Sequence, residues 1–467
     1  MTDYSSLRTI DDLRNSGYVV RPVREEIRNN LIDRIRAEEI VFPGIIGFED
    51  SVIPQLENAI LAGQDVILLG ERGQAKSRLI RGLVGLLDDF VPKIAGCEIN
   101  CNPYEPICRA CLNRLAEEGD YTPIEWMPRE ERYSEKLATP DISIADLIGE
   151  IDPIKVAEGH YLSDELVIHY GLVPRTNRGI FCINELPDLA ERIQVGLFNL
   201  MEERDVQIKG YRIRLPLDVY VVSTANPEDY TNRGRIVTPL KDRYGSQIHT
   251  HYPRDPRDEI AIMEQERNRF PDEDRLVVPD YMKRILAEIT AQARQSSEIN
   301  QRSGVSVRVS IANYETALSN AVRRSIIHNE EWACPRVSDL SFIVASFAGK
   351  IELETFEEGR ESRVTDELTR RALLRVFGSY FNLEDLEDVI MAFDLGGTAV
   401  VGSDNPAADY PELVASIEGM DEAIAKLTEG DQRPEVIAAA VEFVLEGLHL
   451  SRRLNCDRSG DSYRYSR

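Results

Sequence analysis

Residues 65–77, DVILLGERGQAKS, join an apolar run to a glycine-rich turn that ends in a lysine and a serine. This pattern is typical of a phosphate-binding loop, in which a buried strand delivers backbone amides and the positive end of the next helix to phosphate oxygens. Lys76 would then reach the outer phosphates, and the Ser77 hydroxyl would ligate magnesium. Ala75 stands where the pattern G-x-x-x-x-G-K-[ST] has glycine, and its Cβ narrows the allowed backbone space. The predicted nucleotide-binding residues are Gly70, Glu71, Arg72, Gly73, Gln74, Ala75, Lys76 and Ser77.

Two further apolar runs lead to polar side chains. Residues 179–186, GIFCINEL, predict a buried strand that ends in Asn184 and Glu185, and residues 218–224, DVYVVST, predict a strand followed closely by Asn226. The carboxyl ends of strands are where α/β sheets bind ligands. The amide oxygen of Asn184 can accept a hydrogen bond from a metal-bound water, although it adds no negative charge. Taken singly, these runs also fit core strands with polar ends, and residues 65–77 fit an ordinary strand-to-helix turn.

Two arginines follow near expected helices. Residues 238–245, TPLKDRYG, place Asp242 and Arg243 on the next helix, and residues 303–310, SGVSVRVS, open a helix with Arg308 near its start. Alone, such an arginine is most simply a solvated charge. Its place after a phosphate loop and two polar strand ends favours a role in neutralising phosphate charge.

The order of these motifs resembles the AAA+ ATPases, in particular the magnesium chelatase I subunit and the MoxR group. Residues 171–179, GLVPRTNRG, resemble the run before the acidic strand of the chelatase subunit, and residues 137–141 with 147–152 resemble another of its segments. Residues 194–204, followed by 206–208 and 211–213, are similar to the helix and hairpin that MoxR proteins insert before the sensor strand. The resemblance runs from about Phe42 to about Glu315.

The resemblance implies roles for the residues that match its motifs. Lys76 and Ser77 become the phosphate and magnesium contacts, and Glu185 becomes the catalytic base that polarises the attacking water. Asn184 stands where the family has the aspartate that organises magnesium, often through water. The predicted cofactors are therefore ATP and Mg²⁺, and the departures at Ala75 and Asn184 favour a slow, partner-stimulated ATPase.

The remaining implied roles concern assembly. Asn226 becomes the first sensor, Arg243 the finger that reaches a neighbouring subunit's γ-phosphate, and Arg308 the arginine of the lid. An arginine supplied across an interface ties hydrolysis to oligomerisation. We therefore expect a homo-oligomeric ring, a hexamer by the family's example.

The predicted fold class is α/β, a P-loop AAA+ domain with a parallel sheet followed by a helical lid and a C-terminal helical region. The expected boundaries are a helical arm over 1–41, the nucleotide-binding domain over 42–255 with a cysteine-rich insertion near 97–111, the lid over 256–350, the helical region over 351–456 and a disordered tail over 457–467. A chain of 467 residues is too long for one ordinary core.

The amino-acid composition indicates which classes of partner the chain is expected to bind. The chain has 81 acidic and 55 basic residues, which gives a net charge of −26. Such a charge disfavours sequence-independent binding to the phosphate backbone of nucleic acids. It contains no run of 18 apolar residues, and its first residues do not read as a signal peptide, so a cytoplasmic protein that binds no membrane is expected.

Four of the seven cysteines, Cys97, Cys101, Cys108 and Cys111, follow the pattern C-x3-C-x6-C-x2-C. Thiols in a cytoplasmic protein stay reduced, so four of them could form a tetrahedral zinc site. Only the last pair has a standard ligand spacing. An iron–sulfur cluster and free cysteines in a loop remain as alternatives.

Three classes of function fit these observations. The first is a MoxR-like motor that uses ATP to remodel or activate a protein partner, by the family's example one with a von Willebrand A domain. The second is the ATPase subunit of a metal-insertion complex of the magnesium chelatase type. The third, a transcriptional activator of the enhancer-binding kind, is disfavoured because the loop that touches sigma factor and a basic helix-turn-helix are missing from the sequence.

Overall fold

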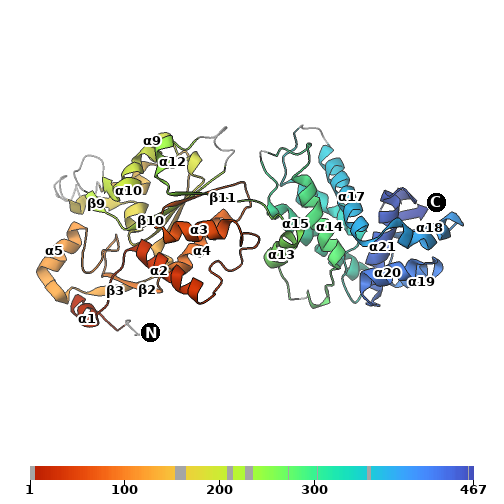
Figure 1. Cartoon of the computed structure of the whole chain (residues 1–467), viewed down its shortest axis with the longest axis horizontal. Coiled ribbons are helices and arrows are strands. Elements are labelled where there is room, and N and C mark those ends of the chain that lie inside the picture. The colour runs from red at the N-terminus through yellow and green to blue at the C-terminus, as the bar shows by residue number, and fades with distance from the viewer. Residues whose placement is uncertain are drawn as a thin grey trace. The chain divides into compact units, whose positions relative to one another are not determined.

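A computed structural model describes residues 6–152, 165–207, 214–226, 235–271, 273–301, 303–354, 359–460 and 462–467. The chain divides into two compact units, residues 1–251 and 252–467 (Figure 1). The second unit holds both the expected lid and the expected C-terminal region. Most of its buried apolar residues, from Met263 to Tyr465, form one cluster, and Cys334, Val436 and Ala439 form a smaller one.

The first unit is built on a five-stranded sheet with the strand order β11-β1-β10-β7-β4. Every neighbouring pair is parallel, as the α/β prediction requires. Strands β1, β7 and β10 are buried at every position, which explains their continuous apolar sequences. The strands are β1 (Val66–Leu69), β4 (Tyr133–Leu137), β7 (Gly179–Asn184), β10 (Val219–Ala225) and β11 (Ser246–His249).

Side chains on the two faces of this sheet belong to two separate cores. Val66 and Leu68 of β1 pack with helices α2, α3 and α4, whereas Ile67 and Leu69 pack with the core that contains α9, α10 and α12. This alternation follows from the two-residue period of a strand. The helices are α2 (Val23–Arg36), α3 (Val52–Leu61), α4 (Lys76–Gly82), α6 (Ile144–Leu147), α8 (Leu172–Arg175), α9 (Glu191–Gly196), α10 (Phe198–Glu202) and α12 (Thr238–Arg243).

The amino-terminal arm is part of the first unit. Glu26 of α2 makes a bidentate ion pair with Arg132 just before β4, with both N–O distances at 2.6 Å. Arg132 also donates to the carbonyl oxygen of Arg178 at 2.8 Å. Both charged side chains are almost fully buried, so the arm is anchored in the core of its own chain.

The first unit also contains three short antiparallel strand pairs. An insertion consists of the antiparallel pair β2 (Phe90–Ile94) and β3 (Ile124–Pro128) with helix α5 (Arg109–Glu118), and α1 (Ile10–Asn15) packs on it. The short pairs β5 (Gly149–Ile151) with β6 (Ile168–Tyr170), and β8 (Asp205–Gln207) with β9 (Arg214–Pro216), are also antiparallel. The second pair confirms a hairpin before β10, although its tip at 208–213 lies outside the described residues.

The second unit is mainly helical. Helix α21 is buried along almost its whole length and packs against α17, α19 and α20. The helices are α13 (Pro256–Glu266), α14 (Asp280–Ala293), α15 (Val307–His328), α16 (Val344–Ala348), α17 (Arg360–Tyr380), α18 (Glu387–Asp394), α19 (Tyr410–Ser416), α20 (Met420–Thr428) and α21 (Pro434–Leu450).

The prediction of a disordered tail was wrong. Strands β13 (Asn455–Ser459) and β14 (Ser462–Ser466) pair with each other, and β14 also pairs with β12 (Ala399–Gly402). The Tyr465 side chain is buried and its hydroxyl donates to Glu446 at 2.5 Å. The polar composition of residues 457–467 suggested disorder because alternate residues of a strand face water, while Tyr465 faces the core.

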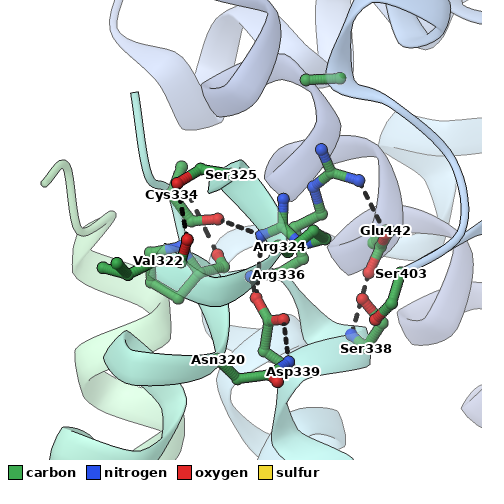
Figure 2. A network of polar contacts seen from close by, with 12 residues as sticks. Asn320, Val322, Arg324, Ser325, Cys334, Arg336, Ser338, Asp339, Ser403 and Glu442 are labelled. Carbon is green, nitrogen blue, oxygen red and sulfur yellow. Dashed lines mark hydrogen bonds and ion pairs between the residues drawn. The ribbon is translucent and has the colours of Figure 1, made fainter. Parts of the chain in front are cut away.

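A buried polar network joins α15 to the segment before α16 (Figure 2). Arg324 forms ion pairs with Asp339 at 3.0 Å and with Glu330 at 3.1 Å, and it donates to the carbonyl oxygen of Cys334 at 2.7 Å. Asn320 donates to Asp339 at 2.6 Å. Each buried charge therefore has several partners, which offsets the cost of removing it from water.

Candidate nucleotide-binding site

The predicted phosphate loop and the two polar strand ends meet at the carboxyl edge of the parallel sheet. Gly70, which follows β1, donates its amide to the carbonyl oxygen of Ala225, the last residue of β10, at 3.1 Å. Asn226 comes next along the chain and is buried. Strand β7 pairs with the other side of β10 and ends at Asn184. Ligands of α/β sheets bind at this kind of edge.

The Gln74 side chain holds the loop through two hydrogen bonds and leaves no room for a side chain at Gly70. The Gln74 side-chain oxygen accepts from the amide of Glu71 at 3.1 Å and from the hydroxyl of Thr250 at 2.7 Å. A Cβ at Gly70 would lie 1.9 Å from the Thr250 hydroxyl oxygen and 2.3 Å from the Gln74 oxygen. Both are rigidly held, so a larger residue at Gly70 would displace the loop.

Ala75 adopts the backbone conformation that the missing glycine would favour. Its φ is 51° and its ψ is 15°, in the left-handed region, and Gly73 also has a positive φ of 76°. For an L-residue this conformation costs about 1–2 kcal/mol. The sequence departs from the usual pattern at this position, but the loop keeps the backbone shape.

Lys76 and Ser77 begin helix α4 directly after the loop. The Lys76 ammonium is buried and donates to the carbonyl oxygens of Gly70 at 2.5 Å and Glu71 at 2.8 Å, so it lies within the curve of the loop. Ser77 is exposed. A cation inside the loop and a hydroxyl at its rim are the arrangement that phosphate and magnesium binding needs.

The end of β7 is fixed by its neighbours on both sides. Asn184 donates its amide to Glu135 of β4, and its oxygen accepts from the Thr224 hydroxyl at 3.3 Å. The same Thr224 oxygen accepts from the backbone amide of Glu185 at 3.0 Å. Glu185 is half-buried and has a φ of 54°. A left-handed non-glycine residue is rare, and such residues cluster at functional sites.

Arg243 is the last residue of α12, as predicted, and is held within its own chain. Its guanidinium forms an ion pair with Glu202, with the Nε–Oε2 distance at 3.1 Å, and donates to the carbonyl oxygen of Pro239 at 2.7 Å. It also lies over the Phe198 ring, 4.7 Å from the centroid. The side chain keeps 25% of its exposure, so one face of the guanidinium is open to solvent.

Arg308 lies in the second unit. It is exposed near the start of α15, and its amide donates to the Ser306 hydroxyl, which caps that helix, at 3.1 Å. Its position near the helix start is as the sequence predicts.

Three contributors to this edge were missed by the sequence analysis. Glu135 touches Asn184 from the adjacent strand, Thr224 supports both Asn184 and Glu185, and Thr250 holds Gln74. Thr224 lies at the end of an apolar run, as Asn226 does, and that signal could have found it. Thr250 follows the polar strand β11 and has no such signal. Glu135 carries no such signal because its contact depends on which strand neighbours β7.

The four predicted metal-binding cysteines also come together. The sulfurs of Cys97, Cys101, Cys108 and Cys111 all lie within 4.8 Å of one another, and all four residues are buried. Cys182, Cys334 and Cys456 are not part of this cluster.

Known proteins with similar sequences point to one group. The magnesium-chelatase subunit ChlI of Nostoc sp. is 29% identical over 243 residues, which cover 50% of this chain and 60% of that protein. The ChlI homolog of Methanocaldococcus jannaschii is 26% identical over 241 residues, with the same two shares. The chain thus spans about 60% of the length of the curated relatives it matches. No family model matches the chain.

Among solved structures, the complex between subunits BchI and BchD of magnesium chelatase, studied by single-particle cryo-EM at 7.5 Å, is similar with a TM-score of 0.37. The sequence identity is 20%, and the match covers 70% of this chain and 98% of that one.

The chain is a distant homologue of the magnesium-chelatase I subunits over about half of its length. None of the helices that the structure describes has the length and apolarity needed to span a bilayer.

Proposed function

We propose that this chain binds ATP with Mg²⁺, hydrolyses it slowly and uses the cycle to remodel or activate a protein partner. The observation that carries the proposal is the meeting of the 70–77 loop, the Asn184–Glu185 strand end and Asn226 at one edge of the sheet. Phosphoryl transfer depends mainly on positioning and charge neutralisation, and these residues supply both.

The loop has the features that a phosphate group needs. The Thr250 hydroxyl and the Gln74 side-chain oxygen occupy the space against Gly70 and hold the start of the loop in place. Lys76 would exchange its contacts with the Gly70 and Glu71 carbonyl oxygens for phosphate oxygens. Ser77 would hold Mg²⁺ through its exposed hydroxyl. When bound, the metal ion neutralises charge that develops on the phosphates.

Glu185 would take part in hydrolysis by accepting a proton from the attacking water. The Thr224 hydroxyl fixes the Glu185 backbone, so the carboxylate leaves the strand in a defined direction. Asn226 would orient the same water or the outer phosphate. Asn184 adds no charge at the metal, so we expect slower turnover than in relatives with aspartate there.

Arg243 would act on the site of a neighbouring copy in a ring, with a hexamer as the expected state. Its place at the end of α12 and its partly exposed guanidinium support this role. Arg308 would contribute from the second unit. The partner would be a protein client, by the family's example one with a von Willebrand A domain.

The test is nucleotide binding and turnover with the full chain. We expect Lys76→Ala to abolish ATP binding and Glu185→Gln to bind ATP but retain it unhydrolysed. Lys350→Ala, which removes an exposed lysine of the second unit, is the matched control and should leave both measurements unchanged. Turnover that persists at wild-type level in both site variants would remove the ATPase proposal.

A second candidate is the ATPase subunit of a metal-insertion complex, favoured because the curated relatives are magnesium-chelatase subunits. The two candidates differ in what hydrolysis drives. A chelatase reconstituted with this chain in place of its own I subunit should insert Mg²⁺ into porphyrin only if the second candidate is correct. Failure there, with intact ATP hydrolysis, would leave the first candidate.

A further inference from the structure

The cysteine cluster of the insertion has the geometry of a metal site. Its four sulfurs come from two segments, the turn after β2 and the start of α5, yet all lie within 4.8 Å of one another. We propose that Cys97, Cys101, Cys108 and Cys111 bind one structural Zn²⁺. The proposal is independent of the ATPase activity, because the phosphate loop uses none of these residues.

The sulfur separations fit a single tetrahedral ion. Zn–S bonds of about 2.3 Å in a tetrahedron place sulfurs roughly 3.8 Å apart, and the Cys97 and Cys108 sulfurs are 3.9 Å apart. A disulfide needs an S–S distance of about 2.05 Å. A cluster of several iron atoms spreads its thiolates over a wider volume than one ion does. Zinc is the common metal for a compact, closed set of four thiolates.

Backbone amides point at the sulfurs, as they do around metal-bound thiolates. The amides of Cys101, Ile107 and Cys111 donate to the sulfurs of Cys97, Cys101 and Cys108 respectively, each at 3.4 Å. Such donors stabilise the negative charge of a thiolate and orient it toward the metal. Each cysteine would bind as a thiolate, so zinc binding releases thiol protons to solvent.

The site is closed but reachable. The four cysteines are between 0% and 8% exposed, which suits a structural ion with no open coordination position. A cavity of about 200 Å³ borders Cys97, Cys108 and Cys111 and gives the ion a path inward. The cluster therefore meets the burial and access requirements of a structural metal site.

The zinc would stabilise the start of the strand that ends in Glu185. The Asn100 side chain, next to Cys101, donates to the carbonyl oxygen of Arg175 at 2.7 Å. Asn177 donates to the carbonyl oxygen of Ile99 at 3.0 Å. These two bonds hold the turn that leads into β7. Loss of the ion would release residues 97–101 and weaken both bonds.

The zinc would also hold the platform on which the amino terminus docks. The Tyr104 hydroxyl donates to the carbonyl oxygen of Tyr18 at 3.0 Å, and Arg14 pairs with Asp120 at 2.6 Å. The Trp126 indole donates to the carbonyl oxygen of Leu7 at 3.2 Å. Trp126 thus reports on this platform from within it.

The first experiment is elemental analysis of the full chain, purified under reducing conditions. We expect about one zinc per chain, the content of a four-thiolate site, and almost none in the variant Cys108→Ser/Cys111→Ser. Cys456→Ser, which removes a thiol outside the cluster, should keep the zinc. Zinc-free wild-type protein, iron in place of zinc, or full zinc content in the double variant would each overturn the proposal.

The second experiment keeps all four cysteines, so it does not depend on the folding of a variant. The chain has two tryptophans, and Trp332→Phe leaves Trp126 as the only one. Removing the metal with a thiol reagent and a chelator should release one zinc per chain and shift Trp126 emission toward that of an exposed indole. Re-adding Zn²⁺ after reduction should reverse the shift. An unchanged emission when zinc leaves would show that the ion does not hold the insertion, and would overturn its structural role.

Discussion

Asn184 of β7 donates its side-chain amide to the carboxylate of Glu135 on β4. Arg81 binds the same carboxylate at 3.0 and 3.2 Å, and the Tyr133 hydroxyl donates to it at 2.9 Å. Partial burial raises the pKa of Glu135, but the hydrogen bonds from Arg81 and Tyr133 outweigh it and hold the pKa below its usual value. The negative charge that position 184 lacks is therefore present on the adjacent strand.

Restoring the acid at position 184 should create a repulsive pair. In Asn184→Asp two carboxylates would lie where an amide and a carboxylate now share a hydrogen bond, which raises the pKa of the pair. A raised folded-state pKa means that stability falls as pH rises toward neutrality. We expect a lower midpoint of thermal unfolding at neutral pH than at mildly acidic pH, relative to wild type, and partial recovery with Mg²⁺. Asn184→Asp/Glu135→Gln has no second carboxylate to repel, so it should lose no further stability at neutral pH relative to Glu135→Gln alone; a further loss as large as that of Asn184→Asp in the wild-type background would argue against repulsion as its cause.

Glu135 should contribute to acid sensitivity. Because its folded-state pKa is lowered, its stabilisation is present above the pKa of the unfolded chain and is lost as pH falls through the folded-state value. Glu135→Gln should therefore be less stable than wild type at neutral pH, with a difference that shrinks on acidification. Chemical denaturation at several pH values measures this. Glu131→Gln, at an exposed position nearby, should show no such trend.

Ala75→Gly should stabilise the protein or leave it unchanged. Glycine removes the left-handed penalty of about 1–2 kcal/mol, while the greater freedom of the unfolded chain offsets about 0.4–1 kcal/mol of that gain. Ala62→Gly is the matched control, since Ala62 has a right-handed backbone at the end of α3 and should lose stability. Denaturant midpoints compare the two. A loss at Ala75 as large as that at Ala62 would contradict the strained conformation.

The Glu26–Arg132 pair should make a large contribution to the stability of the first unit. Glu26→Gln leaves a buried guanidinium without its counter-charge, and breaking such a pair costs about 3–5 kcal/mol. Asp33→Asn on the same helix removes one partner of an exposed pair with Arg36 and should cost less than about 1 kcal/mol. Urea unfolding of both variants gives the comparison. Equal losses would mean that the arm is not anchored through this pair.

In the ring that we propose, Arg243 must leave Glu202 before it can reach the site of another copy. Glu202→Gln weakens the ion pair that holds Arg243 in its own chain, so assembled protein should hydrolyse ATP as fast as wild type or faster. Arg243→Ala should keep ATP affinity and lose hydrolysis, and mixing it with wild type should lower the activity of the mixture. Steady-state turnover with light scattering tests both points. A monomer at every concentration with ATP would be inconsistent with the role.

The centre of the parallel sheet could be predicted because β1, β7 and β10 are buried on both faces and so have continuous apolar sequences. Three apolar runs, at 65–77, 179–186 and 218–224, correspond to β1, β7 and β10. The polar residues that follow these runs lie at one edge of the sheet. This part of the site depends on local sequence and one general rule for α/β sheets. Arg243 and Arg308 were likewise placed on helices by local pattern alone.

The remaining features depend on contacts between distant segments. Glu135 meets Asn184 only because β4 is the neighbour of β7, and no spacing in the sequence shows strand order. Glu26 and Arg132 are far apart in the chain and look like ordinary surface charges. The tail was misread because β14 obtains its stability from β12, which lies far upstream.

The position of β14 between β12 and β13 sets the order in which the chain can fold during synthesis. Residues 1–251 form a compact unit, so its residues are all available once residue 251 has left the ribosome. The second unit lacks the middle strand of its sheet and the buried Tyr465 until residues 462–466 emerge. Domains generally fold as units from the amino terminus. The first unit can therefore fold while the second is still being translated, and the second unit completes its sheet last.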